Sequence, residues 1–202
     1  MIVSRKHRLI YVGINKTATT SIESVLRPYR SRYFQKYLGI KHQMRHGRRP
    51  AFKHVPAAMA RDLVGSTIWE KYFTFTFVRN PWDRVLSEFS RHRYNRESDI
   101  PMKQAFTEWV AAGGNWLARH NTMSDFVSNE NGDVIVDFIG KIESLESDLA
   151  IVLDKVGVPH IEMKHLNRSD NKPHYREIYT RETREIVTQW VQKDADMFGY
   201  SF

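Results

Sequence analysis

Short apolar, β-prone runs alternate along the chain with segments in which apolar residues recur at helical spacing. Residues 9–13 and 72–78 form continuous runs of this kind, as expected for strands buried on both faces of a sheet. A further run spans 134–139, and residues 51–54 are a candidate for a brief additional strand. The alternation predicts an α/β fold with a central parallel sheet flanked by helices.

The segments between these runs begin with residues that cap helices. Thr20 or Ser21 is a candidate cap for the first helix, with Glu23 placed as in a capping box. Asn80 and Pro81 suit the N-cap and the first position of another helix. The expected helices cover residues 20–26, 57–63, 81–89, 102–111, 144–156 and 181–194, the last capped by Thr180.

Two regions predict helical structure of a less regular kind. A helix beginning at Pro56 is expected to present one apolar face, formed by Ala57, Met59, Ala60 and Leu63. Residues 31–50 are aromatic and basic, and predict a short helix followed by a loop. No repeat, low-complexity tract or linker rich in Pro, Gly and Ser divides the 202 residues. A single domain spanning 1–202 is therefore expected.

The composition limits the classes of function. The chain has 31 Lys and Arg, 23 Asp and Glu and no Cys, which gives a formal net charge of +8. The absence of Cys excludes a disulfide scaffold, a thiolate zinc site and a catalytic Cys, and the positive charge favours an anionic partner. The first apolar run is too short for a secretory or membrane segment, and no later run is long enough for either. We therefore expect a cytoplasmic protein without a membrane anchor.

The segment after the first strand-like run has the layout of a phosphate-binding loop. Gly13 and Lys16 lead through a hydroxyl-rich stretch into the first helix. Backbone N–H groups in such a turn bind anions together with the helix dipole. The hydroxyl residues are Thr17, Thr19, Thr20 and Ser21. The spacing is not that of the Walker A motif, in which the lysine follows a second glycine, and a Thr-rich helix start with a solvated lysine is the alternative.

Arg79 follows the strand-like run 72–78 at the edge where parallel sheets bind ligands. Its guanidinium is a bidentate donor for phosphate, and Ser87 lies about two helical turns further on, within reach of the same group. A carboxylate that could hold magnesium is missing at the strand end. A surface salt bridge of Arg79 is the simpler alternative. Two phosphate sites without a Walker lysine favour a nucleotide with phosphates at both ends of its ribose.

Several segments resemble motifs of the sulfotransferases that use 3′-phosphoadenosine 5′-phosphosulfate (PAPS). Residues 16–21, Lys-Thr-Ala-Thr-Thr-Ser, are similar to their 5′-phosphosulfate loop, and residues 77–87 to their 3′-phosphate motif. Residues 137–143 and 194–200 resemble later parts of the carbohydrate branch, which includes chondroitin, dermatan and heparan 2-O enzymes and soluble bacterial members. The resemblance implies a three-layer α/β fold similar to that of P-loop NTPases.

The resemblance also implies roles for individual residues. Lys16 would neutralise charge on the oxygen that bridges phosphate and sulfate, while Arg79 and Ser87 would hold the 3′-phosphate. The remaining donor-binding residues would be Asn15, Thr17, Ala18, Thr19, Thr20, Ser21, Asn167 and Ser169. Asn15 and Ala18 replace the family's usual proline and glycine, and Ala18 requires that this position avoid positive φ. No metal is required, and the product would be 3′,5′-ADP (PAP).

Transfer to a hydroxyl needs a general base, because the pKa of the hydroxyl lies far above 7. His54 is the leading candidate, since it follows the possible strand at 51–54 and would emerge at the same sheet edge as Lys16. Its context, Lys-His-Val-Pro-Ala, also resembles that of the family's catalytic histidine. The other candidates are His42, His46 and His120.

The acceptor surface is expected in the basic run 41–49. An anionic or polyhydroxylated acceptor, such as a uronate-containing glycan, would bind Arg45, Arg48 and Arg49, with Lys53 assisting. A solvated basic loop is the alternative. Nearby aromatic rings could stack on sugar faces, although their helical spacing is also typical of a core; they are Tyr29, Tyr33, Phe34 and Tyr37.

The leading hypothesis is therefore a PAPS-dependent sulfotransferase that acts on a saccharide hydroxyl and has no nucleic acid partner. A P-loop kinase would bind magnesium and ATP, but the chain lacks both the Gly-Lys-Ser/Thr motif and the strand-end aspartate. A nucleic-acid-binding module would account for the charge, but no recognised motif of that class is present. A PAP-binding relative without catalytic activity is a further alternative.

Overall fold

The computed structural model describes residues 1–47, 52–93, 100–159 and 173–202. The chain divides into two compact units, of which the first comprises 1–78 and 125–167 and the second 79–124 and 168–202. The first unit contains the sheet and the second is helical. Each has its own cluster of buried apolar side chains. The single domain expected from the sequence stays a prediction.

Four strands form one sheet in the first unit. In spatial order they are β1 (Ile2–Ser4), β2 (Leu9–Tyr11), β3 (Phe73–Val78) and β4 (Phe138–Lys141). β1 is antiparallel to β2, whereas β2, β3 and β4 are parallel. Tyr11 pairs with Phe75, and Val78 pairs with Lys141. The carboxyl ends of the three parallel strands therefore share one edge, which is the ligand-binding edge of α/β sheets.

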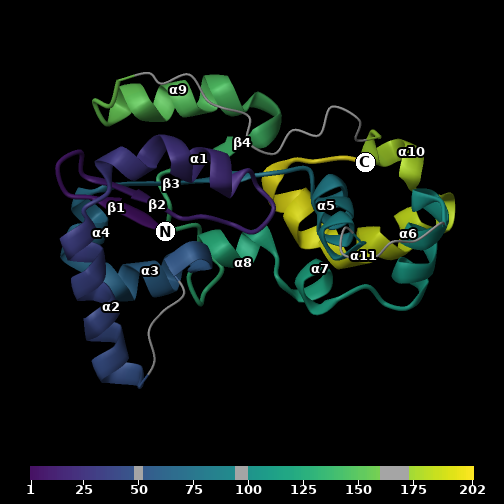
Figure 1. Ribbon diagram of the computed structural model, residues 1–202, viewed down its shortest axis with the longest axis horizontal. Helices are drawn as coiled ribbons and strands as arrows, with labels where there is room; N and C mark the ends of the chain where they lie inside the picture. Colours follow the sequence, from purple (N-terminus) through teal and green to yellow (C-terminus); the bar gives the residue numbers. More distant parts are fainter. Residues whose placement is uncertain (48–51, 94–99, 160–172) are drawn as a thin grey trace. The chain divides into compact units, whose positions relative to one another are not determined.

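Helices cover both faces of this sheet (Figure 1). α1 (Thr19–Leu26) and α9 (Leu145–Lys155) pack on the face that carries the rings of Tyr11, Phe75 and Phe77. The other helices of the unit are α2 (Arg32–His46), α3 (Ala57–Val64) and α4 (Ser66–Lys71), with α3 and α4 on the opposite face. The predicted α/β fold with a sheet between helical layers is confirmed, with one antiparallel strand added.

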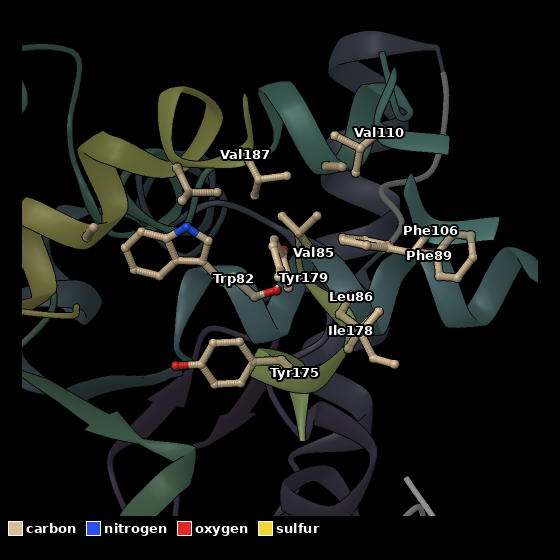
Figure 2. Close-up of a cluster of buried hydrophobic side chains, with 13 residues drawn as sticks. Trp82, Val85, Leu86, Phe89, Phe106, Val110, Tyr175, Ile178, Tyr179 and Val187 are labelled. Carbon is tan, nitrogen blue, oxygen red and sulfur yellow. Dashed lines mark hydrogen bonds between the residues drawn. The ribbon is translucent and has the colours of Figure 1, made fainter. Parts of the chain in front are cut away.

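The second unit packs five helices around aromatic side chains. They are α5 (Pro81–Arg93), α6 (Met102–Ala111), α7 (Trp116–His120), α10 (Tyr175–Ile178) and α11 (Arg181–Phe198). Figure 2 shows Trp82, Leu86 and Phe106 converging with Tyr179, whose hydroxyl donates to the carbonyl of Trp82 at 2.9 Å. Burial raises the pKa of Tyr179 well above its usual value. The remaining helix, α8 (Met123–Val127), spans the boundary between the two units.

The predicted caps of α5 and α11 are confirmed. The side-chain oxygen of Asn80 accepts from the backbone N–H groups of Trp82 and Asp83, at 3.1 and 3.3 Å. Thr180 forms a capping box with Thr183. Such caps satisfy N–H groups that have no partner within the helix. The helices expected at 102–111, 144–156 and 181–194 correspond to α6, α9 and α11, and the last continues four residues beyond its expected end.

The strand considered at 51–54 is wrong. Phe52–His54 forms a short 3₁₀ helix, η2. β2 already has β1 on one side and β3 on the other, so no position beside β2 is left for a further strand. β1 itself was not predicted, because a three-residue strand is defined by its pairing partner more than by its own sequence.

Three local predictions are also corrected. The strand expected at 134–139 begins at Phe138, because the Asp137 carboxylate binds the backbone N–H and hydroxyl of Thr74, both at 2.7 Å. The short helix expected after residue 31 is the fifteen-residue α2, and Gly47, with φ 70°, caps its carboxyl end. Met59 is exposed, because a residue two positions after the first of α3 lies roughly 200° around the helix.

Candidate active site

The predicted phosphate loop connects β2 to α1 within the first unit. Lys16 and Ala18 both adopt left-handed backbone angles, with φ of 66° and 52°. Ala18 is the N-cap of α1, and no side chain caps the helix. The predicted caps Thr20 and Ser21 are therefore wrong, and so is the expectation that Ala18 avoids positive φ. The loop keeps the backbone shape that a glycine would adopt without strain.

Two of the loop hydroxyls shape the loop from inside. Thr17 and Thr19 are buried, and each donates its hydroxyl proton to the carbonyl of Ile14, at 3.1 and 2.5 Å. Ser21 is also buried, whereas Thr20 is exposed and Asn15 is half-buried. The tight turn and the first backbone N–H groups of α1 together make the arrangement that binds anions.

Gly13 allows η2 to pack against this loop. A Cβ at Gly13 would lie 3.1 Å from the carbonyl oxygen of Lys53 and 2.9 Å from the methyl group of Thr19. The imidazole Nδ1 of His54 then lies 3.2 Å from the carbonyl oxygen of Gly13. His54 is therefore held against the phosphate loop, although the element that carries it is not the strand first considered.

This contact determines the tautomer of His54. A carbonyl oxygen can only accept, so Nδ1 must carry the proton. In the neutral ring the nitrogen that can accept a proton is then Nε2, as a general base requires. His42 is buried and stacks near His46, with ring centroids 4.5 Å apart, and His120 is exposed in the second unit. Of these four histidines, only His54 has a hydrogen bond to the loop among the described contacts.

Tyr11 and Thr76 support the start of the loop, and neither was singled out from the sequence. The Tyr11 ring is fully buried and would contact a Cβ at Gly13 at 3.5 Å. Burial raises the pKa of Tyr11 far above its usual value, so the phenol is neutral. The Thr76 hydroxyl donates to the carbonyl of Val12 at 2.6 Å. A buried aromatic in a strand is normally interpreted as core, so only the strand register could have indicated this position.

Arg79 is the first residue of the second unit and directly follows β3. Both its Nε and one terminal nitrogen bind the same carboxylate oxygen of Asp83, Nε at 2.7 Å. Asp83 was not singled out from the sequence, although a residue four positions after an arginine at a helix start is a natural ion-pair partner. Ser87 lies further along α5 and is half-buried. The Arg79 guanidinium is thus oriented by the Asp83 carboxylate.

Arg84, in contrast, is part of the core. It is buried and donates to the carbonyl of Asn121 at 2.6 Å. Burial lowers its pKa, and the neighbouring carboxylates of Asp194 and Glu88 oppose that effect. Asp194 also accepts the backbone N–H groups of Met123 and Ser124, both at 2.8 Å. These contacts give the 194–200 segment a structural role.

The segment 137–143 also has a structural role. Asp137 joins the start of β4 to β3, and Gly140 lies under the ring of Phe77, where a Cβ would approach to 2.5 Å. The backbone N–H of Lys141 donates to Asp148 at 2.7 Å. These contacts fix the carboxyl end of β4 at the edge that carries the phosphate loop.

The predicted acceptor residues are less fully described. Lys53 is exposed on η2, beside His54. Arg45 belongs to α2, but its side chain lies outside the described residues, as do Arg48, Arg49, Asn167 and Ser169. Within the described ranges no group of three or more acidic or histidine side chains could hold a metal ion. No helix in this part of the chain is long and apolar enough to cross a membrane.

A loop of this shape at the carboxyl edge of a parallel sheet lies where α/β proteins bind phosphate-containing ligands. The sulfotransferase family profile matches residues 1–201. The chain therefore belongs to the sulfotransferase family.

Two relatives and one solved structure are similar to this chain. An uncharacterized protein of Archaeoglobus fulgidus is 38% identical over 106 residues, which cover 52% of this chain and 84% of that protein. Carbohydrate sulfotransferase 14 of Danio rerio is 23% identical over 241 aligned residues, and the match covers 99% of this chain but only 62% of that enzyme. The crystal structure of a sulfotransferase from Alicyclobacillus acidocaldarius has the same fold, with a TM-score of 0.50, 12% identity and coverage of 96% of each chain.

Proposed function

We propose that this protein transfers the sulfuryl group of PAPS to a hydroxyl group of a carbohydrate acceptor, with His54 as the general base. Membership of the sulfotransferase family supports the reaction class. The single observation that carries the assignment of the base is the contact between His54 Nδ1 and the carbonyl of Gly13. That contact supports the role of His54, because it makes Nδ1 the donor to the loop that contains Lys16 and leaves Nε2 as the nitrogen that would accept a proton.

The loop supplies the groups that a PAPS phosphosulfate needs. Backbone N–H groups at the start of α1 would bind the 5′-phosphate, because they form the positive end of the helix dipole. Lys16 would neutralise the negative charge that develops on the bridging oxygen as the leaving group departs. Thr17 and Thr19 would act by holding the loop in shape, since both hydroxyls donate to Ile14.

Arg79 would bind the 3′-phosphate with Ser87. A guanidinium that already donates two hydrogen bonds to one carboxylate oxygen is pre-oriented for an oxyanion. Asp83 would have to share Arg79 with the phosphate. This sharing makes the binding free energy between Arg79 and the phosphate less favourable. It also reduces the side-chain entropy that Arg79 would lose on binding, because Asp83 already orders the guanidinium.

The proposed transfer step accounts for each bond and proton without a metal ion. The acceptor oxygen attacks sulfur while its proton moves to Nε2 of His54, and the bond between sulfur and the bridging oxygen of PAPS breaks. The electron pair of that bond stays on the phosphate oxygen of the leaving PAP, beside the Lys16 ammonium. Positioning in line and stabilisation of the leaving charge supply the catalysis.

A carbohydrate is the proposed acceptor. Carbohydrate sulfotransferase 14 is a curated relative that aligns with 99% of this chain. The chain also carries Lys53 exposed beside His54, where a cation could bind an acidic sugar. Uronate-containing saccharides combine such a carboxylate with free hydroxyl groups.

Calorimetric titration with PAP tests donor binding first. Wild-type protein should bind PAP, and Lys16→Ala and Arg79→Ala should each weaken binding about tenfold or more, since each removes a charged hydrogen bond. Lys155→Ala is the matched control, because Lys155 is an exposed lysine at the end of α9. Absence of PAP binding to wild-type protein at near-millimolar ligand would overturn the proposed function.

A further inference from the structure

An open pocket of about 520 Å³ lies in the first unit and takes no part in the proposed reaction. Its lining residues are Arg5, Tyr33, Phe34, Tyr37, Ile68 and Tyr72. Arg5 follows the last residue of β1, and Tyr72 precedes the first residue of β3. Because β1 is antiparallel to β2 and β3 is parallel to it, both positions lie at the amino-terminal edge of the parallel strands. The phosphate loop leaves the opposite edge.

Hydrogen bonds between α2 and β1 build the pocket before any ligand arrives. The backbone N–H of Arg5 donates to the Ser31 hydroxyl at 2.8 Å, and the backbone N–H of Ser31 donates to the carbonyl of Val3 at 2.9 Å. The side chain of Gln35 adds a bond to the carbonyl of Met1 at 3.0 Å. The walls are therefore fixed to the sheet, and little ordering cost remains for binding.

Two of the aromatic rings that line this pocket face solvent. Tyr33 is 91% exposed and Tyr37 is 57% exposed, so the core role considered for them is wrong. Phe34 stacks with Tyr37, with ring centroids 6.2 Å apart, and the Arg5 guanidinium lies 5.6 Å from the Phe34 ring centre. Flat rings that carry phenolic hydroxyls can pack on the apolar face of a sugar and hydrogen-bond its hydroxyl groups. Exposed aromatic groups of this kind mark interaction surfaces.

The charge around the pocket selects an anionic ligand. Residues 1–60 contain thirteen Lys and Arg and a single acidic residue, Glu23, whereas the rest of the chain has more acidic than basic residues. The basic run 41–49 supplies only four of the thirteen. Exposed cations near the pocket are Arg5, Lys6, Arg8, Arg32 and Lys36, and none of them is ion-paired within the described part of the chain. Glu70 of α4 is the acidic residue closest in sequence to Ile68 and Tyr72.

We propose that this pocket, formed by β1, α2 and α4, is a second binding site for an acidic glycan chain, remote from the site of transfer. This inference rests on the proposed function, because a glycan acceptor makes a chain-anchoring site useful. β3 has six residues. At a rise of about 3.3 Å per residue, the amino-terminal and carboxyl edges of the sheet are about 20 Å apart. A long acceptor can occupy both sites, whereas a disaccharide reaches only one. The site therefore favours long acceptors.

The test uses a labelled, unsulfated chondroitin dodecasaccharide and fluorescence anisotropy at low salt. The double variant Tyr33→Ala, Tyr37→Ala should bind it about tenfold more weakly, because two stacking rings are lost. Both side chains are exposed, so the fold should be retained. Met44→Ala is the matched control, since Met44 is 83% exposed on the same helix. Unchanged affinity of the double variant, or no binding by wild-type protein, would overturn the inference.

Two further measurements separate this inference from its alternatives. An oligothymidylate of equal charge is titrated in parallel, and selective loss of its binding in the double variant would assign the pocket to nucleic acid and overturn the inference. PAP affinity and sulfation of a disaccharide should stay at wild-type values in the double variant, while KM for the dodecasaccharide rises. If wild-type protein fails to bind PAP, the proposed function fails, and the anisotropy result still decides whether the pocket binds glycan.

Discussion

Replacing Ala18 by Gly is expected to stabilise the protein, because Ala18 has a φ of 52°. An L-residue in the left-handed region costs about 1–2 kcal/mol, and glycine adopts this region without that cost. Glycine loses roughly 0.4–1 kcal/mol more chain entropy on folding. The difference predicts a net gain of about 0.5–1 kcal/mol, equivalent to a rise in Tm of about 1–4 °C for a chain of this length.

The assay is urea unfolding of both proteins, followed by far-ultraviolet circular dichroism. Ala150→Gly is the matched control, since Ala150 lies inside α9 of the same unit, and glycine there should cost about 0.5–1 kcal/mol. Ala18→Val should also destabilise, because a β-branched residue tolerates positive φ least. If Ala18→Gly lowers the urea midpoint as Ala150→Gly does, the conformation assigned to the loop is refuted.

Three other predictions concern Gly140, Asp83 and Tyr11. Gly140→Ala should lower the free energy of unfolding in urea by about 1–3 kcal/mol, because the added Cβ would lie 2.5 Å from the Phe77 ring. Adding Phe77→Leu to this variant should recover part of the loss if the clash is the cause. Asp83→Asn should raise the PAP affinity measured by calorimetry roughly two- to fivefold, since it removes the carboxylate that competes for Arg79; weaker binding would contradict that competition. Burial raises the pKa of Tyr11 in the folded protein. The neutral phenol therefore contributes its full stabilisation below the pKa of the unfolded state, about 10, and the protein loses that stabilisation as the pH rises above this value. The free energy of unfolding of Tyr11→Phe should therefore fall less than that of wild type between pH 9 and pH 11. An equal fall in both proteins would contradict the raised pKa of Tyr11.

The elements with strong local signals were predictable. The β3 segment is a continuous β-prone run, and Asn80 with Pro81 starts a helix by capping chemistry that needs no tertiary context. The phosphate loop was also recognisable, because its position between a strand and a helix is encoded locally. These features allowed the sulfotransferase family to be recognised from the sequence.

The parts that depend on distant contacts were not predictable. β1 exists through its pairing with β2, and that pairing excludes the strand considered at 51–54. His54 lies against the loop because Gly13 admits the carbonyl of Lys53, which no local pattern signals. The left-handed conformation of Ala18 is imposed by the tight turn into α1. Propensity alone predicts the opposite sign of φ at this residue.

His54 is the proposed base for sulfuryl transfer from PAPS. Transfer of radiolabelled sulfate from PAPS to an unsulfated chondroitin acceptor tests this role most directly, in wild-type protein, His54→Ala and His120→Ala. We expect His54→Ala to lower kcat by about 10²–10⁴ while PAP affinity is retained, and His120→Ala to transfer sulfate at the wild-type rate. Transfer by His54→Ala at the wild-type rate would contradict this role.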